Sequence, residues 1–180
     1  SQEWLVDGIL PLRGYALIFG ASGNGKSFIG VDLALAIKNA RRWGGREVRQ
    51  GEVVYIAAED PFGLHARTCS RLRGGKWDLE GFHIIKEPLD LSRGSKDIDE
   101  IIPAIKDGMA GKLPALVIID TFQRVAGGID ENNASEVMGV VGNIDKITQA
   151  FDCLVVLVHH VGKSFNNPFG CSLTLPTPNI

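Results

Sequence analysis

A glycine-rich octapeptide in the first part of the chain has the residue types and the spacing that bind phosphate groups. It reads Gly20, Ala21, Ser22, Gly23, Asn24, Gly25, Lys26 and Ser27, which fits the pattern G-x-x-x-x-G-K-[ST]. Glycines let several backbone N–H groups face one anion, and a helix that begins here adds its positive end. In such loops the lysine reaches the β- and γ-phosphates, and the serine hydroxyl ligates Mg²⁺. We therefore predict that this octapeptide binds ATP, the alternative being a glycine-rich turn with an exposed lysine.

An aspartate after an apolar run is the predicted partner of Ser27 in holding the metal. Residues 115–119 read ALVII, which is typical of a buried strand, and Asp120 follows directly. A carboxylate at the end of such a strand holds Mg²⁺ in P-loop proteins. The alternative is an aspartate that caps the next turn. Thr121 stands where many ATPases place a water-activating glutamate, so the catalytic base is expected elsewhere.

A second acid follows another predicted strand and can supply that base. Residues 52–57 read EVVYIA, and Ala58, Glu59 and Asp60 come next. Because ligands of parallel sheets bind at the carboxyl ends of the strands, Glu59 is predicted to reach a water near the γ-phosphate. A carboxylate there can orient and activate the water. The alternative is a solvated loop acid beside Asp60.

Two adjacent histidines follow the last apolar run, residues 153–158. A polar side chain at the end of that strand can contact the γ-phosphate and report its presence to the next loop, so His159 and His160 are both candidates. The alternative is a structural pair that is hydrogen-bonded within the fold. No cysteine or carboxylate accompanies the histidines at the spacing of a zinc site, so the sequence does not favour one.

The elements that must position these residues alternate between strand and helix. Short apolar runs predict strands at residues 15–19, 52–57, 82–85, 115–119 and 153–158. Longer segments predict helices at residues 26–42, 62–73, 97–109 and 134–150. Asn133 and Glu136 resemble a capping box at the start of the last helix. This alternation predicts an α/β fold with a mostly parallel sheet and helices on both faces, in three layers.

Composition limits the class of protein. The chain has 180 residues, of which 44% are hydrophobic and 22% charged, and this suits one soluble globular domain. The formal net charge of −2 excludes a globally basic nucleic-acid binder, and no apolar run approaches a membrane span. Three cysteines without CxxC spacing predict reduced thiols in a cytoplasmic protein. We expect one domain over residues 1–180, with a core at about 4–164 and a tail at 165–180.

Four motifs in a fixed order carry a family resemblance. GASGNGKS, YIAAEDP, LVIIDTFQR and LVHHVGKS follow one another as they do in the RecA-like P-loop ATPases. The chain is most similar to the family of the plasmid replicative helicase RepA and AAA-type phage and plasmid ATPases. The resemblance implies that Glu59 is the catalytic glutamate, Asp120 the Walker B acid and His160, rather than His159, the sensor. It also implies that the histidine strand lies between the phosphate-loop strand and the Asp120 strand, with the Glu59 strand beyond Asp120.

The resemblance implies an activity and a set of partners. Such a domain binds ATP and Mg²⁺ and hydrolyses ATP in DNA replication or recombination. Its single-stranded DNA would contact loops that correspond to residues 122–133 and 162–167, the alternative being loops without a DNA contact. Positive charge in these loops is sparse, with Arg124 and Lys163.

The end of the chain departs from the family pattern. After HHVGK the family carries an arginine-rich stretch, whereas the last arginine here is Arg124. We therefore expect a C-terminally truncated domain, the alternative being a tail that has diverged. In either case we expect slow turnover and a chain that is monomeric or weakly associated, although full-length members form homo-oligomers. The second hypothesis is a nucleotide-responsive binding module with little or no turnover. A small-molecule kinase is disfavoured because no arginine-rich lid is visible.

Overall fold

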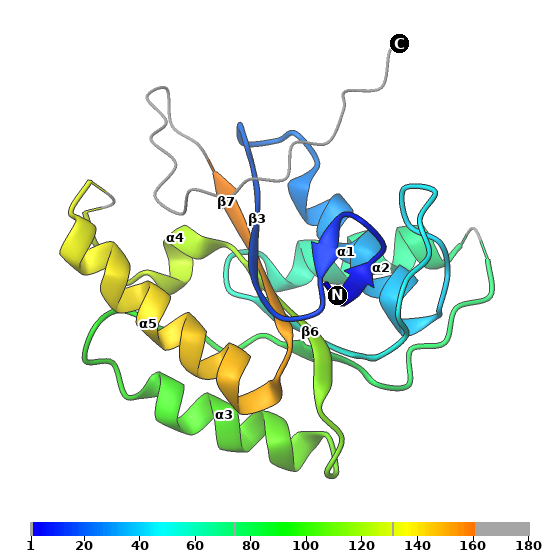
Figure 1. The fold of residues 1–180 in the computed structure, drawn as a ribbon. Helices are drawn as coiled ribbons and strands as arrows, with labels where there is room; N and C mark the ends of the chain where they lie inside the picture. The colour runs from blue at the N-terminus through cyan, green and yellow to red at the C-terminus, as the bar shows by residue number, and fades with distance from the viewer. Residues whose placement is uncertain (1, 74, 131, 161–180) are drawn as a thin grey trace.

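A five-stranded parallel sheet forms the centre of the computed structural model, which describes residues 2–73, 75–130 and 132–160 (Figure 1). In spatial order its strands are β3 (Gly14–Gly20), β7 (Leu154–His160), β6 (Pro114–Asp120), β4 (Glu52–Ala57) and β5 (Phe82–Ile85). Every pairing between neighbours is parallel. This order is the one that the family resemblance implies. The predicted tail, residues 165–180, lies outside the described residues.

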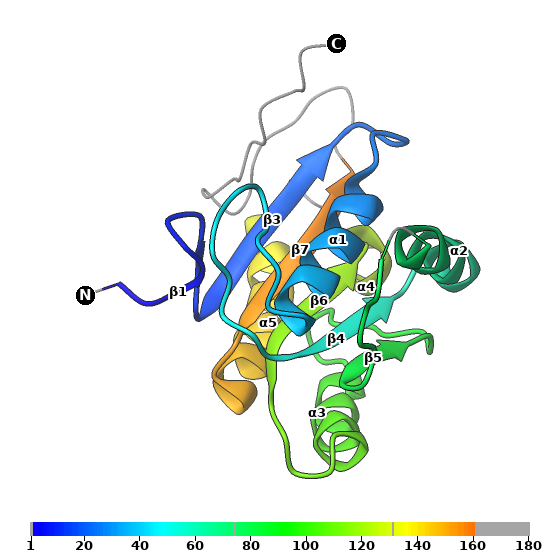
Figure 2. The same ribbon diagram turned by 90° about the vertical axis from the view of Figure 1, so that its right-hand side faces the viewer.

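Helices cover both faces of the sheet, which confirms the predicted α/β fold. One face carries α1 (Lys26–Lys38) and α2 (Pro61–Leu72). The other carries α3 (Asp97–Gly108), α4 (Phe122–Val125) and α5 (Ala134–Phe151), as the two views show (Figures 1 and 2). None of the helices in the described ranges combines the length and apolar character that crossing a bilayer requires.

Alternate residues of the strands pack into two apolar cores, one on each face. On β4, Val53 and Tyr55 belong to the core under α1 and α2, whereas Val54 and Ile56 belong to the core under α3, α4 and α5. This period of two is expected for a sheet that is covered on both faces. Each fully buried aliphatic side chain contributes about 1.5–3 kcal/mol, so the two cores hold the carboxyl ends of the strands in fixed positions.

A short hairpin precedes the sheet, and the sequence pattern does not predict it. β1 (Trp4–Val6) pairs antiparallel with β2 (Leu10–Pro11). Leu5 and Val6 are fully buried and extend the core under α1. Val6 also forms a bridge to Val48, which ties the hairpin to the segment between α1 and β4. Strands this short carry no readable periodicity, so their positions follow from tertiary packing.

The first long helix ends at Lys38, earlier than the predicted end at residue 42. Asn39 ends it, because its side-chain amide donates to Leu35 O at 2.9 Å and its Oδ1 accepts from the Asp78 N–H at 2.7 Å. Ala40 then adopts a left-handed φ of +51°, which no α-helix continues. Trp43, just past the predicted end, is buried and forms an isolated bridge with Arg46 outside the helix.

The start of α5 differs in detail from the predicted capping box. Asn133 is the N-cap, and its side chain accepts from the Ser135 N–H at 3.1 Å. Glu136 bonds the Asn133 side chain through Oε1 and accepts the Asp130 N–H through Oε2. The glutamate thus closes the preceding turn rather than returning to the backbone N–H of the cap residue.

Two further boundaries bear on the site. The strand predicted over residues 153–158 continues through His159 and His160, which are therefore the last residues of β7 rather than residues after it. The segment 122–133, expected to be a loop, begins with the short helix α4, in which Phe122 and Val125 are fully buried. The other expected DNA-facing loop, residues 162–167, lies outside the described residues.

Candidate functional site

A cavity of about 230 Å³ lies at the carboxyl edge of the sheet, beside the start of α1. Eight of the residues that the sequence singles out line it: Ser22, Gly23, Gly25, Lys26, Ser27, Glu59, Asp120 and His160. They come from the ends of three strands and from the loop after β3. Because parallel strands bring their carboxyl ends to one edge, segments far apart in the sequence meet in one cavity.

The loop between β3 and α1 takes backbone conformations that require glycine. Gly23 and Gly25 have φ values of +81° and +75°, in the left-handed region that side chains disfavour. Gly25 is also the N-cap of α1, and it offers no side chain to the first N–H groups of the helix. These N–H groups and the positive end of the helix make the loop suited to an anion.

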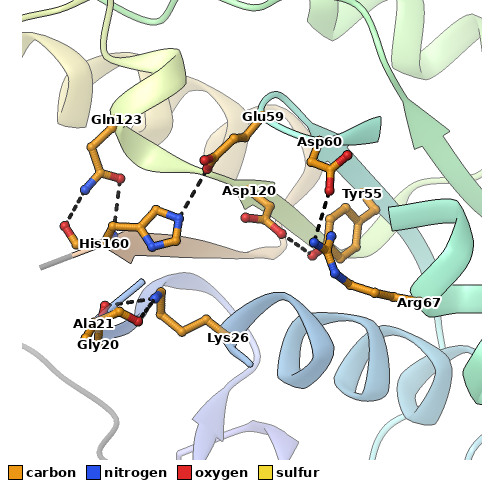
Figure 3. Close-up of polar contacts among 10 residues, drawn as sticks. All are labelled: Gly20, Ala21, Lys26, Tyr55, Glu59, Asp60, Arg67, Asp120, Gln123 and His160. Atoms are coloured by element: carbon orange, nitrogen blue, oxygen red, sulfur yellow. Dashed lines mark hydrogen bonds and ion pairs between the residues drawn. The ribbon is translucent and has the colours of Figure 1, made fainter. Parts of the chain in front are cut away.

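The Lys26 side chain is buried within this loop. Its ammonium group donates to Gly20 O at 2.8 Å and to Ala21 O at 2.7 Å (Figure 3). Burial lowers the pKa of Lys26, and the negative charges of Asp120 and Glu59 oppose that shift. The amine therefore lies in a position where an anion in the cavity would stabilise its charged form.

Asp120 ends β6, and its carboxylate is held on one side by a tyrosine. The Tyr55 hydroxyl donates to Asp120 Oδ2 at 2.8 Å, and Tyr55 itself is fully buried on β4 (Figure 3). Tyr55 pairs with Ile118 and Ala57 pairs with Asp120, so Tyr55 and Asp120 are diagonal neighbours on the same face of the sheet.

Ser27 and Asp120 line the same cavity and give it a hydroxyl and a carboxylate oxygen. Hard oxygen donors are the ligands of Mg²⁺, which at nucleotide sites takes its other ligands from phosphates and water. Across the described ranges, no three His, Cys, Asp or Glu side chains group closely enough to hold a metal by themselves. The donor set therefore fits a nucleotide-bound Mg²⁺ better than a metal held by protein alone.

The adjacent acids Glu59 and Asp60 point in different directions. Asp60 is the N-cap of α2: its Oδ1 accepts the Gly63 N–H at 2.7 Å, and its Oδ2 pairs with Arg67 at 3.1 Å. Glu59 Oε2 instead lies 3.2 Å from His160 Nε2, across the cavity (Figure 3). Asp60 thus stabilises a helix start, while the half-exposed Glu59 side chain is directed toward His160 at the end of β7.

His160 is fixed through its backbone by a residue of α4. Gln123 Nε2 donates to His160 O at 2.5 Å, and the His160 N–H donates to Gln123 Oε1 at 3.3 Å. The ring nitrogen Nδ1 is buried and has no hydrogen-bond partner among the described residues. These two hydrogen bonds to the His160 backbone hold the His160 ring beside Glu59, at the edge of the cavity.

His159 and Asn24 do not line the cavity. His159 is buried on the opposite face of β7 and packs edge-on against Phe122, with ring centroids 5.5 Å apart. Burial, His160 and Lys26 lower the pKa of His159. The Asn24 N–H donates to Ala21 O at 3.4 Å, so this residue shapes the loop. The strand's alternation therefore separates the two histidines, because adjacent residues face opposite sides.

Sequence reasoning missed three residues of the site. Tyr55 and Gln123 hold Asp120 and His160, and Arg67 lines the cavity with its guanidinium 5.7 Å from the centre of the Phe28 ring. Tyr55 could have been found, because a tyrosine in an otherwise aliphatic buried strand needs a hydrogen-bond partner. Gln123 stands in the motif LVIIDTFQR and Arg67 in the predicted helix 62–73, but their contacts at the site depend on the folded arrangement and cannot be read from the sequence.

A comparison with protein families agrees with this geometry. A family model described as an AAA domain matches residues 1–165, which include every residue of the cavity.

Proposed function

The chain belongs to the AAA domain family, and on this premise we propose that it binds ATP with Mg²⁺ and hydrolyses the γ-phosphate. Membership of the family itself indicates a nucleotide-binding domain of the P-loop ATPase type. One observation carries the finer proposal. A lysine, a serine, three acids and a histidine from the ends of different elements line one cavity beside a helix N-terminus. Such a set can hold a triphosphate and activate a water.

In this proposal the loop holds the phosphates. The N–H groups around Gly23 and Gly25 bind phosphate oxygens, and Lys26 turns its ammonium from the loop carbonyls to the β- and γ-phosphates. The Ser27 hydroxyl and the Asp120 carboxylate are the protein ligands of Mg²⁺. When bound, the metal neutralises charge on the phosphates and holds them in one orientation.

Glu59 is the proposed base for the attacking water. As the water oxygen forms a bond to the γ-phosphorus, the bond to the β-phosphate oxygen breaks, and the water proton passes to Glu59. His160 already contacts Glu59 at 3.2 Å, so a γ-phosphate that accepts a hydrogen bond from His160 would change the position of the base. His160 is in this way proposed as the group that links phosphate binding to the end of β7.

The same contact favours a second candidate function. A glutamate that shares its oxygen with a histidine ring is less free to accept a proton, as in a nucleotide-responsive binding module with little or no turnover. Steady-state phosphate release by the purified chain distinguishes the two functions. ATPase function predicts release that requires Mg²⁺ and stops with EDTA. A binding module predicts saturable ATP binding without release above the background of a Lys26→Ala variant.

We further propose that the domain is related to the replicative helicase ATPases and acts with single-stranded DNA. Support comes from α4, which carries the exposed Arg124 at the same sheet edge as the cavity. The chain by itself is proposed to be a single domain that is monomeric or weakly associated. Phosphate release with and without single-stranded DNA, together with light scattering, tests both statements. Unstimulated release and no change in fluorescence anisotropy of a labelled oligonucleotide would contradict the DNA role.

A further inference from the structure

A tyrosine hydroxyl lies in the interior of the fold, between the sheet and α1, at the carboxylate of Asp120. Tyr55 stands in the strand EVVYIA, whose other inner positions are aliphatic, and its side chain is fully buried. Its hydroxyl donates to Asp120 Oδ2 at 2.8 Å (Figure 3). A phenylalanine would fill the same volume, so packing alone does not explain why a hydroxyl is present here.

The neighbouring helix leaves room for this hydroxyl. A Cβ atom on Gly30, one turn into α1, would lie 3.0 Å from the Tyr55 hydroxyl oxygen. That separation is shorter than ordinary van der Waals contact, so any side chain at this position would displace the hydroxyl by a few tenths of an ångström. A glycine in a helix interior costs about 0.5–1 kcal/mol relative to alanine, and here it keeps the bond between Tyr55 and Asp120 intact.

The hydroxyl can act only as a donor to the carboxylate. A carboxylate oxygen carries no proton and accepts, so the phenol is the donor of this bond. Among the described residues, no other side chain bonds the Asp120 carboxylate. A donor on Oδ2 alone fixes the rotation of the group and leaves the second oxygen for a ligand in the cavity that Asp120 lines.

We propose that Tyr55 is a positioning residue for magnesium, because its hydroxyl holds Asp120 in the orientation that binds the ion. This inference rests on the proposed function, in which Asp120 is a protein ligand of Mg²⁺. Groups that hydrogen-bond a metal ligand typically change metal affinity about 10–100-fold when they are removed. The Tyr55 hydroxyl is therefore expected to set the Mg²⁺ requirement of the domain, while the phosphate loop sets its affinity for the nucleotide itself.

The test separates metal affinity from nucleotide affinity. ADP binding to wild type and to Tyr55→Phe is measured by thermal shift, first in EDTA and then as Mg²⁺ is titrated at fixed ADP. We expect equal ADP binding in EDTA and a Mg²⁺ midpoint raised about 10–100-fold in Tyr55→Phe. The Mg²⁺ concentration that gives half-maximal phosphate release should rise by the same factor in Tyr55→Phe. The rate of release by this variant should recover at high Mg²⁺. An unchanged midpoint in a folded Tyr55→Phe variant would overturn the proposal.

Two further variants keep the result interpretable. Tyr15→Phe removes the hydroxyl of the chain's other tyrosine, at the amino end of β3, and should leave the midpoint unchanged. Gly30→Ala keeps the Tyr55 hydroxyl but displaces it, so it should raise the midpoint in wild type and add nothing in the Tyr55→Phe background. Additive effects of the two substitutions would show that Gly30 acts by another route, and would count against the proposal.

Failure of the proposed function would look different. If wild type neither binds ADP nor releases phosphate at any Mg²⁺ concentration, the nucleotide site itself is wrong. If wild type binds with a clear Mg²⁺ midpoint that Tyr55→Phe does not move, only the positioning role is wrong.

Discussion

Two neighbouring carboxylates, Glu59 and Asp60, illustrate how residues of the same charge differ in what they contact. Asp60 accepts a backbone N–H of α2 and pairs with Arg67, whereas Glu59 meets His160 across the cavity. A general base must reach the water that it activates, and Glu59 has that freedom because it caps no helix. The two acids can therefore be separated experimentally by substitutions that keep their size.

Glu59→Gln is expected to retain ATP binding and to lose about 10²-fold or more in phosphate release, the contribution of a general base. Glutamine can still bond His160 but cannot accept the proton. Asp60→Asn should release phosphate at close to the wild-type rate, because asparagine is an equally good N-cap. Single-turnover hydrolysis with ATP measures both. A dead Asp60→Asn variant beside an active Glu59→Gln variant would reverse the assignment of the base.

His159 gives a prediction about pH. Its lowered pKa means that the native state binds fewer protons than the unfolded chain as the pH falls below about 6.5. The free energy of unfolding should therefore decrease with acidification from about pH 7 to about pH 5, with a slope of at most about 1.4 kcal/mol per pH unit from this group. Urea unfolding of His159→Gln should show a shallower pH dependence. Gln149→Ala, on the exposed side of α5, is a control without a titratable group and should keep the wild-type slope.

At the scale of elements, the short helix α4 connects β6 and β7, two of the three strands whose ends line the cavity. It begins directly after β6, its Phe122 is buried against His159, and its Gln123 holds both backbone groups of His160 at the end of β7. Four residues thus couple the Asp120 strand to the histidine strand. A change in one of these residues should alter geometry at the γ-phosphate position without touching the phosphate loop.

Gln123→Ala is accordingly expected to lower kcat by up to about 10²-fold while KM for ATP changes little, because a displaced catalytic group loses alignment rather than binding. Steady-state kinetics at saturating Mg²⁺ measure the two constants. Gln149→Ala, on the exposed side of α5, controls for loss of a glutamine elsewhere. A rise in KM with unchanged kcat would show that Gln123 supports binding and not the alignment of His160.

The sequence predicts the five sheet strands and four long helices because each is long enough to show a period or a capping signal. It also predicts the phosphate loop, Glu59, Asp120 and His160, whose roles stay predictions until tested. It does not predict the β1–β2 hairpin or α4, because elements of two to four residues are defined by contacts with distant segments. For the same reason the Tyr55–Asp120 bond is invisible, since it joins residues 65 positions apart.

At the scale of the whole molecule, ligand binding should be visible as stability. A ligand present at 100 times its dissociation constant stabilises the native state by about 2.7 kcal/mol, which for a chain of this size raises Tm by roughly 5–10 °C. Lys26→Ala should lose most of this shift with ATP and Mg²⁺, because a charge-assisted phosphate contact contributes about 1.5–3 kcal/mol. Lys146→Ala, exposed on α5, should keep it. An undiminished shift in Lys26→Ala would refute the phosphate loop as the binding site.

The strand order also has a consequence for how the protein is made. β3 pairs with β7 alone in the described sheet, and Gly14 at the start of β3 lies opposite Leu154, which is synthesised 140 residues later. At about 5–20 residues per second, the ribosome needs roughly 7–28 s to deliver that partner. Until then the phosphate loop lies between an unpaired strand and a helix. Nucleotide binding to the loop would therefore stabilise the fold only at a late step, after β7 has inserted into the middle of the sheet.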